Sequence, residues 1–179
     1  MKRTAQVGWF GTAFWAMLVA IGPNTASAQS DAKLEACLDV VGTFMTYRSI
    51  KDDGAEKKGR SMLSLTNGGQ AFFTDSAQGG GLTFQPFTEG RGSWRCISNE
   101  DGKVMFSVLV FHFTLPTHQD PRQKISRVIT RATYDLEKKE LTGQTAIVYL
   151  PLYDNPMGAG MPGNRINYKF TGFPIVAPE

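Results

Sequence analysis

Hydrophobic and polar positions along most of this chain alternate with the period of a half-buried β-strand. The stretch Lys103–Leu115 (KVMFSVLVFHFTL) is apolar on both of its alternating faces, which predicts a central strand covered on both sides or lining a cavity. Runs rich in branched, aromatic and Thr residues predict seven more strands, over 41–50, 60–66, 71–74, 93–98, 124–136, 141–150 and 165–173.

Short turn signals separate these strands. Asn67-Gly68 is the strongest, because both central residues of the favoured two-residue hairpin turn need positive φ. Residues 51–58 and 151–164 are predicted loops, the first charged and the second rich in Gly, Pro and Asn. Before the strands, Ser30–Val40 has the one clear helical period, with Leu34, Cys37 and Leu38 on one face.

Eight antiparallel strands with short connections most simply close into an up-and-down barrel, which leaves no exposed sheet edge. The predicted fold is therefore all-β: an eight-stranded antiparallel barrel preceded by a short N-terminal helix. An open sandwich is the alternative, because a sequence does not show closure.

The first 28 residues have the three regions of a secretory signal peptide. Met1-Lys2-Arg3 is basic, residues 7–22 are apolar, and Ala26-Ser27-Ala28 offers small residues at an A-x-A cleavage site. The apolar run is shorter than the ~20 residues of a membrane-spanning helix. We predict cleavage after Ala28, and a periplasmic or extracellular domain of residues 29–179 without stable membrane insertion.

Both cysteines, Cys37 and Cys96, lie in the predicted mature domain. A pair of cysteines in an exported chain predicts a disulfide, because that compartment is oxidising. A reactive thiol is the alternative, but neither cysteine has a Cys-x-x-Cys spacing or a nearby His that would lower its pKa.

Two Gly-x-aromatic segments open predicted strands, Gly42-Thr43-Phe44 after the helix and Gly92-Ser93-Trp94 later. With the hairpin segment Ser64–Gly69, they resemble the small exported bacterial branch of the lipocalin-like calycins, although Phe44 stands where that pattern has Trp. The resemblance covers 41–173 and implies a ligand-binding barrel. At the level of architecture the chain also resembles allene-oxide-cyclase-type barrels, some of which are cyclases.

The residue types needed for common catalytic sites are scarce. The chain has two His and two Cys. If the two Cys form a disulfide, the two His are too few for a metal site of three or four ligands. Neither His belongs to a recognisable nucleophile motif. We therefore expect no metal and no cofactor. Arg127 and Arg131 share a face with Ile125 and Ile129 and are expected to face solvent over a partly apolar outer wall. The alternative is a clamp for a carboxylate or phosphate at a mouth of the barrel.

His112 is the most unusual residue, an ionisable group between Phe111 and Phe113. Facing a cavity, it would suit hydrogen bonding or proton transfer; facing the core, it would be a structural, hydrogen-bonded residue. The other candidate ligand-binding residues are strand residues with polar or cationic groups: Arg48, Tyr134, Tyr149 and Tyr168.

The leading hypothesis is an exported soluble barrel that binds a small, largely apolar molecule. The alternatives are a cofactor-free cyclase or isomerase that uses His112 and Tyr134, and a structural or protein-interaction barrel without a cavity. An outer-membrane barrel is disfavoured by Arg127 and Lys169 in mid-strand. Nucleic acid is not an expected partner, because basic clusters interleaved with aromatics are missing. The pattern leaves the oligomeric state open.

The formal net charge of +3 includes Lys2 and Arg3 of the predicted signal peptide. Without them 17 basic and 16 acidic residues remain, a net charge of +1. The basic total therefore gives little reason to expect an anionic partner, and we expect the partner inside the barrel.

Overall fold

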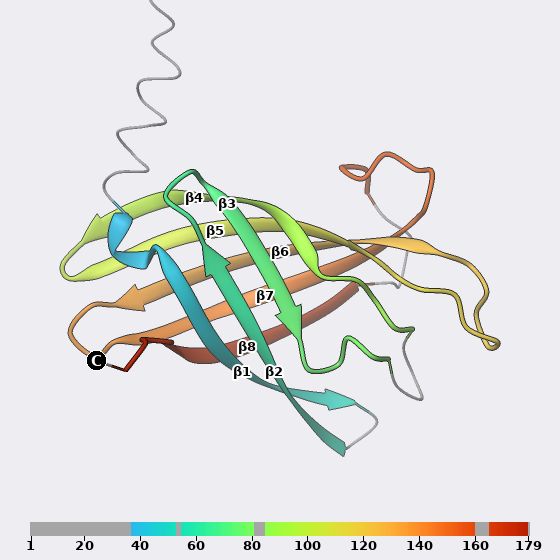
Figure 1. Ribbon diagram of the computed structural model, residues 1–179, viewed down its shortest axis with the longest axis horizontal. Coiled ribbons are helices and arrows are strands. Elements are labelled where there is room, and N and C mark those ends of the chain that lie inside the picture. The colour runs from blue at the N-terminus through green and yellow to red at the C-terminus, as the bar shows by residue number, and fades with distance from the viewer. Residues whose placement is uncertain (1–36, 53–54, 81–84, 160–164, 179) are drawn as a thin grey trace, which may run out of the picture.

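The computed structural model describes residues 37–52, 55–80, 85–159 and 165–178, with side chains for all of these except 50–52 and 55–57. Its strands are β1 (Gly42–Asp52), β2 (Ala55–Leu65), β3 (Gln70–Asp75), β4 (Gly90–Glu100), β5 (Lys103–Phe113), β6 (Lys124–Asp135), β7 (Glu140–Pro151) and β8 (Arg165–Pro174). Each strand pairs antiparallel with the next, and β8 pairs with β1, so the sheet is closed. Figure 1 shows β1, β2 and β3 crossing in front of the long strands β5, β6 and β7. The predicted all-β, eight-stranded antiparallel barrel is confirmed.

The β1–β2 hairpin is longer than the sequence indicated. Of the charged stretch 51–58, predicted as a loop, residues 51–52 belong to β1 and residues 55–58 to β2, with Asp52 opposite Ala55 and Lys51 opposite Glu56. The loop prediction was wrong because ladder hydrogen bonds to a neighbouring strand outweigh the weak strand propensity of Lys, Glu and Gly.

The hairpin predicted at Asn67-Gly68 is present between β2 and β3, but its turn differs. Four residues connect the strands, and it is Gly69 that has positive φ, +76°. The Thr66 N–H donates to the Gln70 carbonyl at 3.0 Å, and the Gln70 N–H donates to Thr66 Oγ1 at 3.1 Å. A longer loop thus replaces the two-residue turn.

The predicted helix over Ser30–Val40 receives no support from its described part. Leu38–Val40 forms one 3₁₀ turn, η1, and residues 30–36 lie outside the described residues, as does the predicted signal peptide. No helix in the described ranges is long and apolar enough to span a membrane.

The lumen has two chemically different ends. The apolar end contains the hydrophobic core, in which Phe44 of β1 meets Tyr134 of β6 edge to face, with ring centroids 5.3 Å apart. Val40 of η1 is fully buried in the same cluster. From this pair the core extends along the lumen as far as Val110, Val128 and Tyr168, which adjoin the polar end. The core also includes Cys37, Leu63, Leu65, Ala71, Trp94, Cys96, Val104, Phe106, Val108, Ala132, Leu141 and Phe170. Burial of these side chains provides most of the hydrophobic stabilisation of the barrel.

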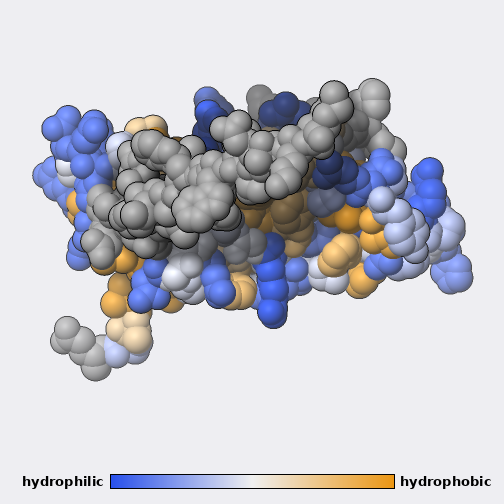
Figure 2. Space-filling view, turned by 90° about the horizontal axis from the view of Figure 1, so that it is seen from above, coloured by the Kyte–Doolittle hydropathy of each residue, from blue (hydrophilic) through white to orange (hydrophobic). Residues whose placement is uncertain are grey.

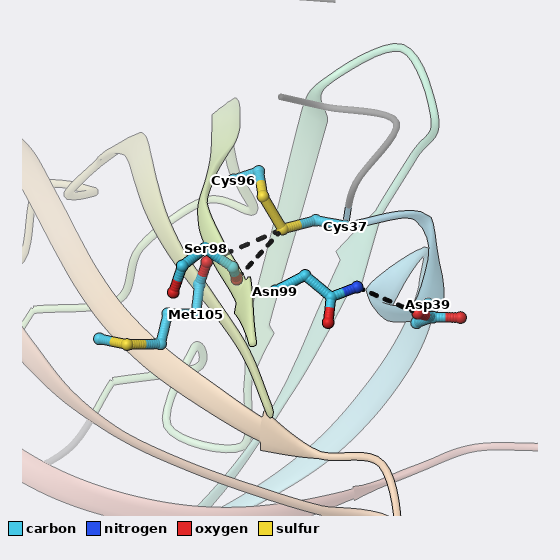
Figure 3. Close-up of a disulfide and its surroundings, with 6 residues drawn as sticks. All are labelled: Cys37, Asp39, Cys96, Ser98, Asn99 and Met105. Carbon is cyan, nitrogen blue, oxygen red and sulfur yellow. Dashed lines mark hydrogen bonds between the residues drawn. A yellow bond between two sulfur atoms is a disulfide. The ribbon is translucent and has the colours of Figure 1, made fainter. Parts of the chain in front are cut away.

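The predicted disulfide between Cys37 and Cys96 is present (Figure 3). It joins the segment before β1 to the middle of β4, across 59 residues of sequence, and the two Cα atoms are 5.6 Å apart, within the usual range. Beside it, the Asn99 amide donates to the Asp39 carboxylate at 3.4 Å. The disulfide and this bond attach η1 to the barrel wall.

On the outer wall, Arg127 does not face solvent as predicted. It is 9% exposed, and its Nη1 donates to the carbonyls of Pro156 (3.0 Å) and Gly158 (2.9 Å) in the β7–β8 connection. This connection therefore packs on the outside of β6, which covers Arg127. Arg131, four residues further along β6 on the same face, is exposed as predicted.

Candidate functional site

The polar end of the lumen is built on three strands that bring polar side chains into one register row. His112 of β5 is opposite Ser126 of β6, and Ser126 is opposite Tyr149 of β7. Residues directly opposite each other in a sheet point to the same face. The three side chains therefore face the lumen side by side, although 14 and 23 residues of chain separate them.

Two atoms in this row are buried without a partner among the described residues, His112 Nδ1 and Ser126 Oγ. His112 is 3% exposed and Ser126 is fully buried. The ring of Phe87 covers His112, with centroids 4.6 Å apart. Leaving a buried polar atom unpaired costs about 1 to 3 kcal/mol, so these two adjacent atoms are candidates for hydrogen bonds to a bound molecule.

A hydrogen-bonded ion pair lies across the same end of the lumen. Arg48 of β1 donates through both terminal nitrogens to the carboxylate of Asp75 at the end of β3, with Nη2 2.7 Å from Oδ1. Ser61 of β2 donates to Asp75 Oδ2 at 2.6 Å and accepts from Arg48 Nη1 at 2.8 Å. The Arg48 and Asp75 side chains are only 12% and 4% exposed, so the pair is buried, and its two charges cancel.

Hydroxyl groups continue this polar layer on β6, β7 and β8. Thr130 and Thr145 hydroxyls are 2.9 Å apart, and the Tyr168 ring lies under the Arg48 guanidinium at 5.4 Å. Burial raises the pKa of Tyr168 to about 12, although Arg48 opposes the shift. Burial, with Asp75 contributing, also raises the pKa of Tyr149. Both phenols therefore stay protonated at physiological pH.

Burial lowers the pKa of His112 to about 4, although the Asp75 carboxylate acts in the opposite direction. The imidazole is therefore neutral at physiological pH. With a neutral His112, neutral tyrosines and a cancelled Arg48–Asp75 pair, the polar end carries no net charge among the described residues.

The structure places four of the five predicted ligand-binding residues together. Arg48, His112, Tyr149 and Tyr168 all face the polar end of the lumen. Tyr134 lies at the apolar end, packed against Phe44, because it follows Ser126 by eight residues and so lies near the opposite end of β6.

Sequence reasoning missed Ser61, Asp75, Phe87 and Ser126. Asp75 is the next position after Ala71 and Phe73 on the same face of the strand, so the two-residue period could have placed it on the inner face. Ser61 and Ser126 look like ordinary strand residues, and only pairing with β1, β3 and β5 gives them their neighbours.

In the described ranges no group of three or more His, Cys, Asp or Glu side chains could hold a metal ion. Comparisons of the chain with protein-family models, with curated proteins and with solved structures gave no match. The barrel architecture is consistent with a calycin-like fold, and lipocalin-like and allene-oxide-cyclase-type families remain resemblances.

Proposed function

We propose that this protein is an exported barrel that binds a small, largely apolar molecule in its lumen, with one neutral polar group of that molecule at the polar end. The observation that supports this most directly is the pair of buried, unpartnered atoms, His112 Nδ1 and Ser126 Oγ. A hydroxyl or carbonyl group placed between them would satisfy both.

The surroundings favour an apolar body for this ligand. The register row next to His112 and Ser126 consists of Val110, Val128 and Ile147, and Phe87 closes the other side. The interior of an eight-stranded barrel is just wide enough to be filled by side chains or to hold one small ligand, so the ligand must be small.

The absence of net charge at the polar end favours a neutral head group over a carboxylate or a phosphate. Both terminal nitrogens of Arg48 already donate hydrogen bonds to the Asp75 carboxylate. An anion would have to compete with that carboxylate and lose its own hydration in the lumen.

The test uses protein stripped of bound small molecules and a series of long-chain primary alcohols, their matching alkanes and their matching carboxylic acids. We expect the alcohols to raise the melting temperature most, because their neutral hydroxyl can hydrogen-bond to His112 and Ser126. A ligand at 100 times its Kd adds about 2.7 kcal/mol of stability. His112→Phe with Ser126→Ala should abolish the difference between alcohol and alkane. Ser93→Ala, on the exposed outer wall of β4, is the matched control and should preserve it.

A melting temperature that no member of the series raises would count against the proposal, as would a difference between alcohol and alkane that survives in the His112→Phe/Ser126→Ala variant. Mass spectrometry of small molecules extracted from protein purified from its own host would then identify the ligand directly.

The cyclase or isomerase alternative depends on the same unpartnered His112. A general base works best when its pKa lies near the working pH, and the pKa of about 4 makes His112 a weak base near neutrality. Binding is therefore the better-supported of the two functions.

Export is part of the proposal and rests on the basic, apolar and small-residue regions of the first 28 residues together with the Cys37–Cys96 disulfide. N-terminal sequencing of protein from the periplasm or medium should begin at Gln29. A mature protein that keeps Met1, recovered from the cytoplasm, would contradict it.

A further inference from the structure

A row of cationic side chains crosses the outer wall of the barrel. Arg95 of β4 is opposite Ser107, Ser107 is opposite Arg131, and the row continues through Gln144 to Lys169 of β8. We call these five residues the basic row. Its three cations are exposed and lie two strands apart, at intervals of about 10 Å.

The cations of the basic row have no acidic partner among the described residues. Arg95 donates to Ser107 Oγ at 3.2 Å, and none of the ion pairs between described residues includes Arg95, Arg131 or Lys169. The carboxylates near the apolar end lie instead on η1, in the β4–β5 and β6–β7 turns, or at the strand ends that these turns join: Asp39, Glu100, Asp101, Asp135, Glu137 and Glu140. The net charge of +1 therefore conceals a separation between a basic waist and an acidic end.

A concavity adjoins this row. Its described lining includes Arg95, Arg131 and Lys169 beside inward-facing residues such as Arg48 and Tyr168. The described lining includes residues of seven strands, all except β3, and no Asp or Glu. In the view of Figure 2, hydrophilic residues lie at both ends of the molecule, and hydrophilic and hydrophobic residues lie side by side between them.

The shape of this surface selects among anionic partners. Strands β4 and β8 are four places apart in a ring of eight, so Arg95 and Lys169 lie on opposite sides of the barrel. A flat membrane surface therefore reaches only part of the row, whereas a flexible linear polyanion can follow it around the waist.

The side chains between the cations indicate the chemistry of that polymer. Ser107 and Gln144 separate the cations, and a neighbouring register row carries Met105 and then Thr133, Thr142 and Thr171. Short neutral hydrogen-bonding groups suit the hydroxyls of a sugar chain. The basic row contains no aromatic ring on which nucleic-acid bases could stack, and none of the aromatic anchors typical of a protein interface.

We propose that the basic row binds a linear acidic polysaccharide, with Arg95, Arg131 and Lys169 pairing with its anionic groups. This site is independent of the proposed ligand site in the lumen, and each can fail without the other.

The test measures binding of the purified protein to polygalacturonate and to heparin, with neutral dextran as a blank, over a range of salt concentrations. We expect binding that weakens as salt rises, because exposed charges are screened. Arg95→Gln with Arg131→Gln and Lys169→Gln should weaken it about tenfold or more, the combined effect of three exposed ion pairs.

The matched control removes three positive charges from the acidic end, through Lys103→Gln, Lys138→Gln and Lys139→Asn. Asn suits position 139 because Lys139 has a φ of +52°. This variant should bind within about twofold of the original protein, since its changes lie outside the row. Circular dichroism and urea unfolding would show that both variants keep the fold.

Equal weakening in the two variants would overturn the proposal, because binding would then follow net charge alone. So would a lack of binding to either polysaccharide. Equal or tighter binding to poly-glutamate, to phosphatidylglycerol vesicles or to oligo-dT would assign the row to an acidic polypeptide, a membrane or a nucleic acid instead.

Discussion

Asp75 is a single carboxylate that holds Arg48 and Ser61 together inside the barrel. All three side chains come from neighbouring strands, β1, β2 and β3, and the two charges are nearly sheltered from solvent. A charge at this depth is stable only while its partner is present.

Asp75→Asn should therefore lower the free energy of unfolding by about 3 to 5 kcal/mol, because it leaves the Arg48 cation buried without its counter-charge. Urea denaturation measures this loss. Combining Asp75→Asn with Arg48→Met removes the unpaired charge, so the double variant should be more stable than the single one. A double variant that is less stable than Asp75→Asn alone would contradict the argument.

His112 should make stability depend on pH in a defined window. Its pKa is about 4 in the folded protein, compared with 6.5 when unperturbed, so the unfolded chain takes up the proton first as the pH falls. The stability linked to His112 is complete above pH about 6.5 and is lost progressively between 6.5 and 4, by about 3 kcal/mol in all.

The measurement is urea unfolding at several pH values. His112→Gln should flatten the dependence in this window, whereas the same change at His118, exposed in the β5–β6 connection, should leave it as in the original protein. The same slope in all three proteins would rule out His112 as the cause.

Among the elements, the β2–β3 hairpin and the start of β4 support each other. Trp94 Nε1 donates to the Thr66 carbonyl at 2.8 Å, and the Trp94 backbone N–H donates to the Gly69 carbonyl at 2.8 Å. The Gly-Ser-Trp segment that resembles the calycin pattern thus anchors a turn of the neighbouring hairpin.

Gly92 in that segment is required by close approach of β4 to β5. A Cβ atom at this position would lie 1.9 Å from the Leu109 carbonyl oxygen and 2.8 Å from the Val110 Cα. Gly92→Ala should therefore destabilise the barrel by about 3 kcal/mol or more, since backbone atoms of β5 must move. Thermal or urea unfolding measures the effect.

Gly79→Ala is the matched control, because a Cβ there meets no atom within 4 Å. It should change stability little. Equal effects at Gly92 and Gly79 would show that the spacing between β4 and β5 is not what restricts position 92.

At the scale of the whole molecule, the Cys37–Cys96 disulfide restricts the unfolded chain, because it closes a loop across 59 residues. The chain-entropy model gives about 4 kcal/mol of stabilisation for a loop of this length. Reduction, or replacement of both cysteines by Ala, should lower the free energy of unfolding by up to this amount. A reducing agent should then have no further effect on the double variant, and wild-type stability that is unchanged by full reduction would refute the prediction.

The distribution of charge is also a property of the whole molecule. A net charge near zero gave no reason to expect an anionic partner, but register places Arg95, Arg131 and Lys169 in one row that contains no described acid. Because these cations are far apart in sequence, only pairing of their strands assembles the surface.

The sequence alone predicted the eight strands, because each buries one face and so repeats its apolar residues with period two. The same local signals located the hairpin near Asn67-Gly68, and the count of two cysteines indicated the disulfide. Local signals misplaced the loop at 51–58, since strand pairing rather than propensity decides how far a hairpin extends.

Tertiary structure decided which residues meet. Arg48 and Asp75 are 27 residues apart, and Ser126 reaches His112 only through the β5–β6 register. Register depends on the turns between all neighbouring strands and on the pairing of β8 with β1, which no local segment encodes. The candidate residues could therefore be named from their chemical types, whereas the polar end of the lumen and the basic row exist only in the closed barrel.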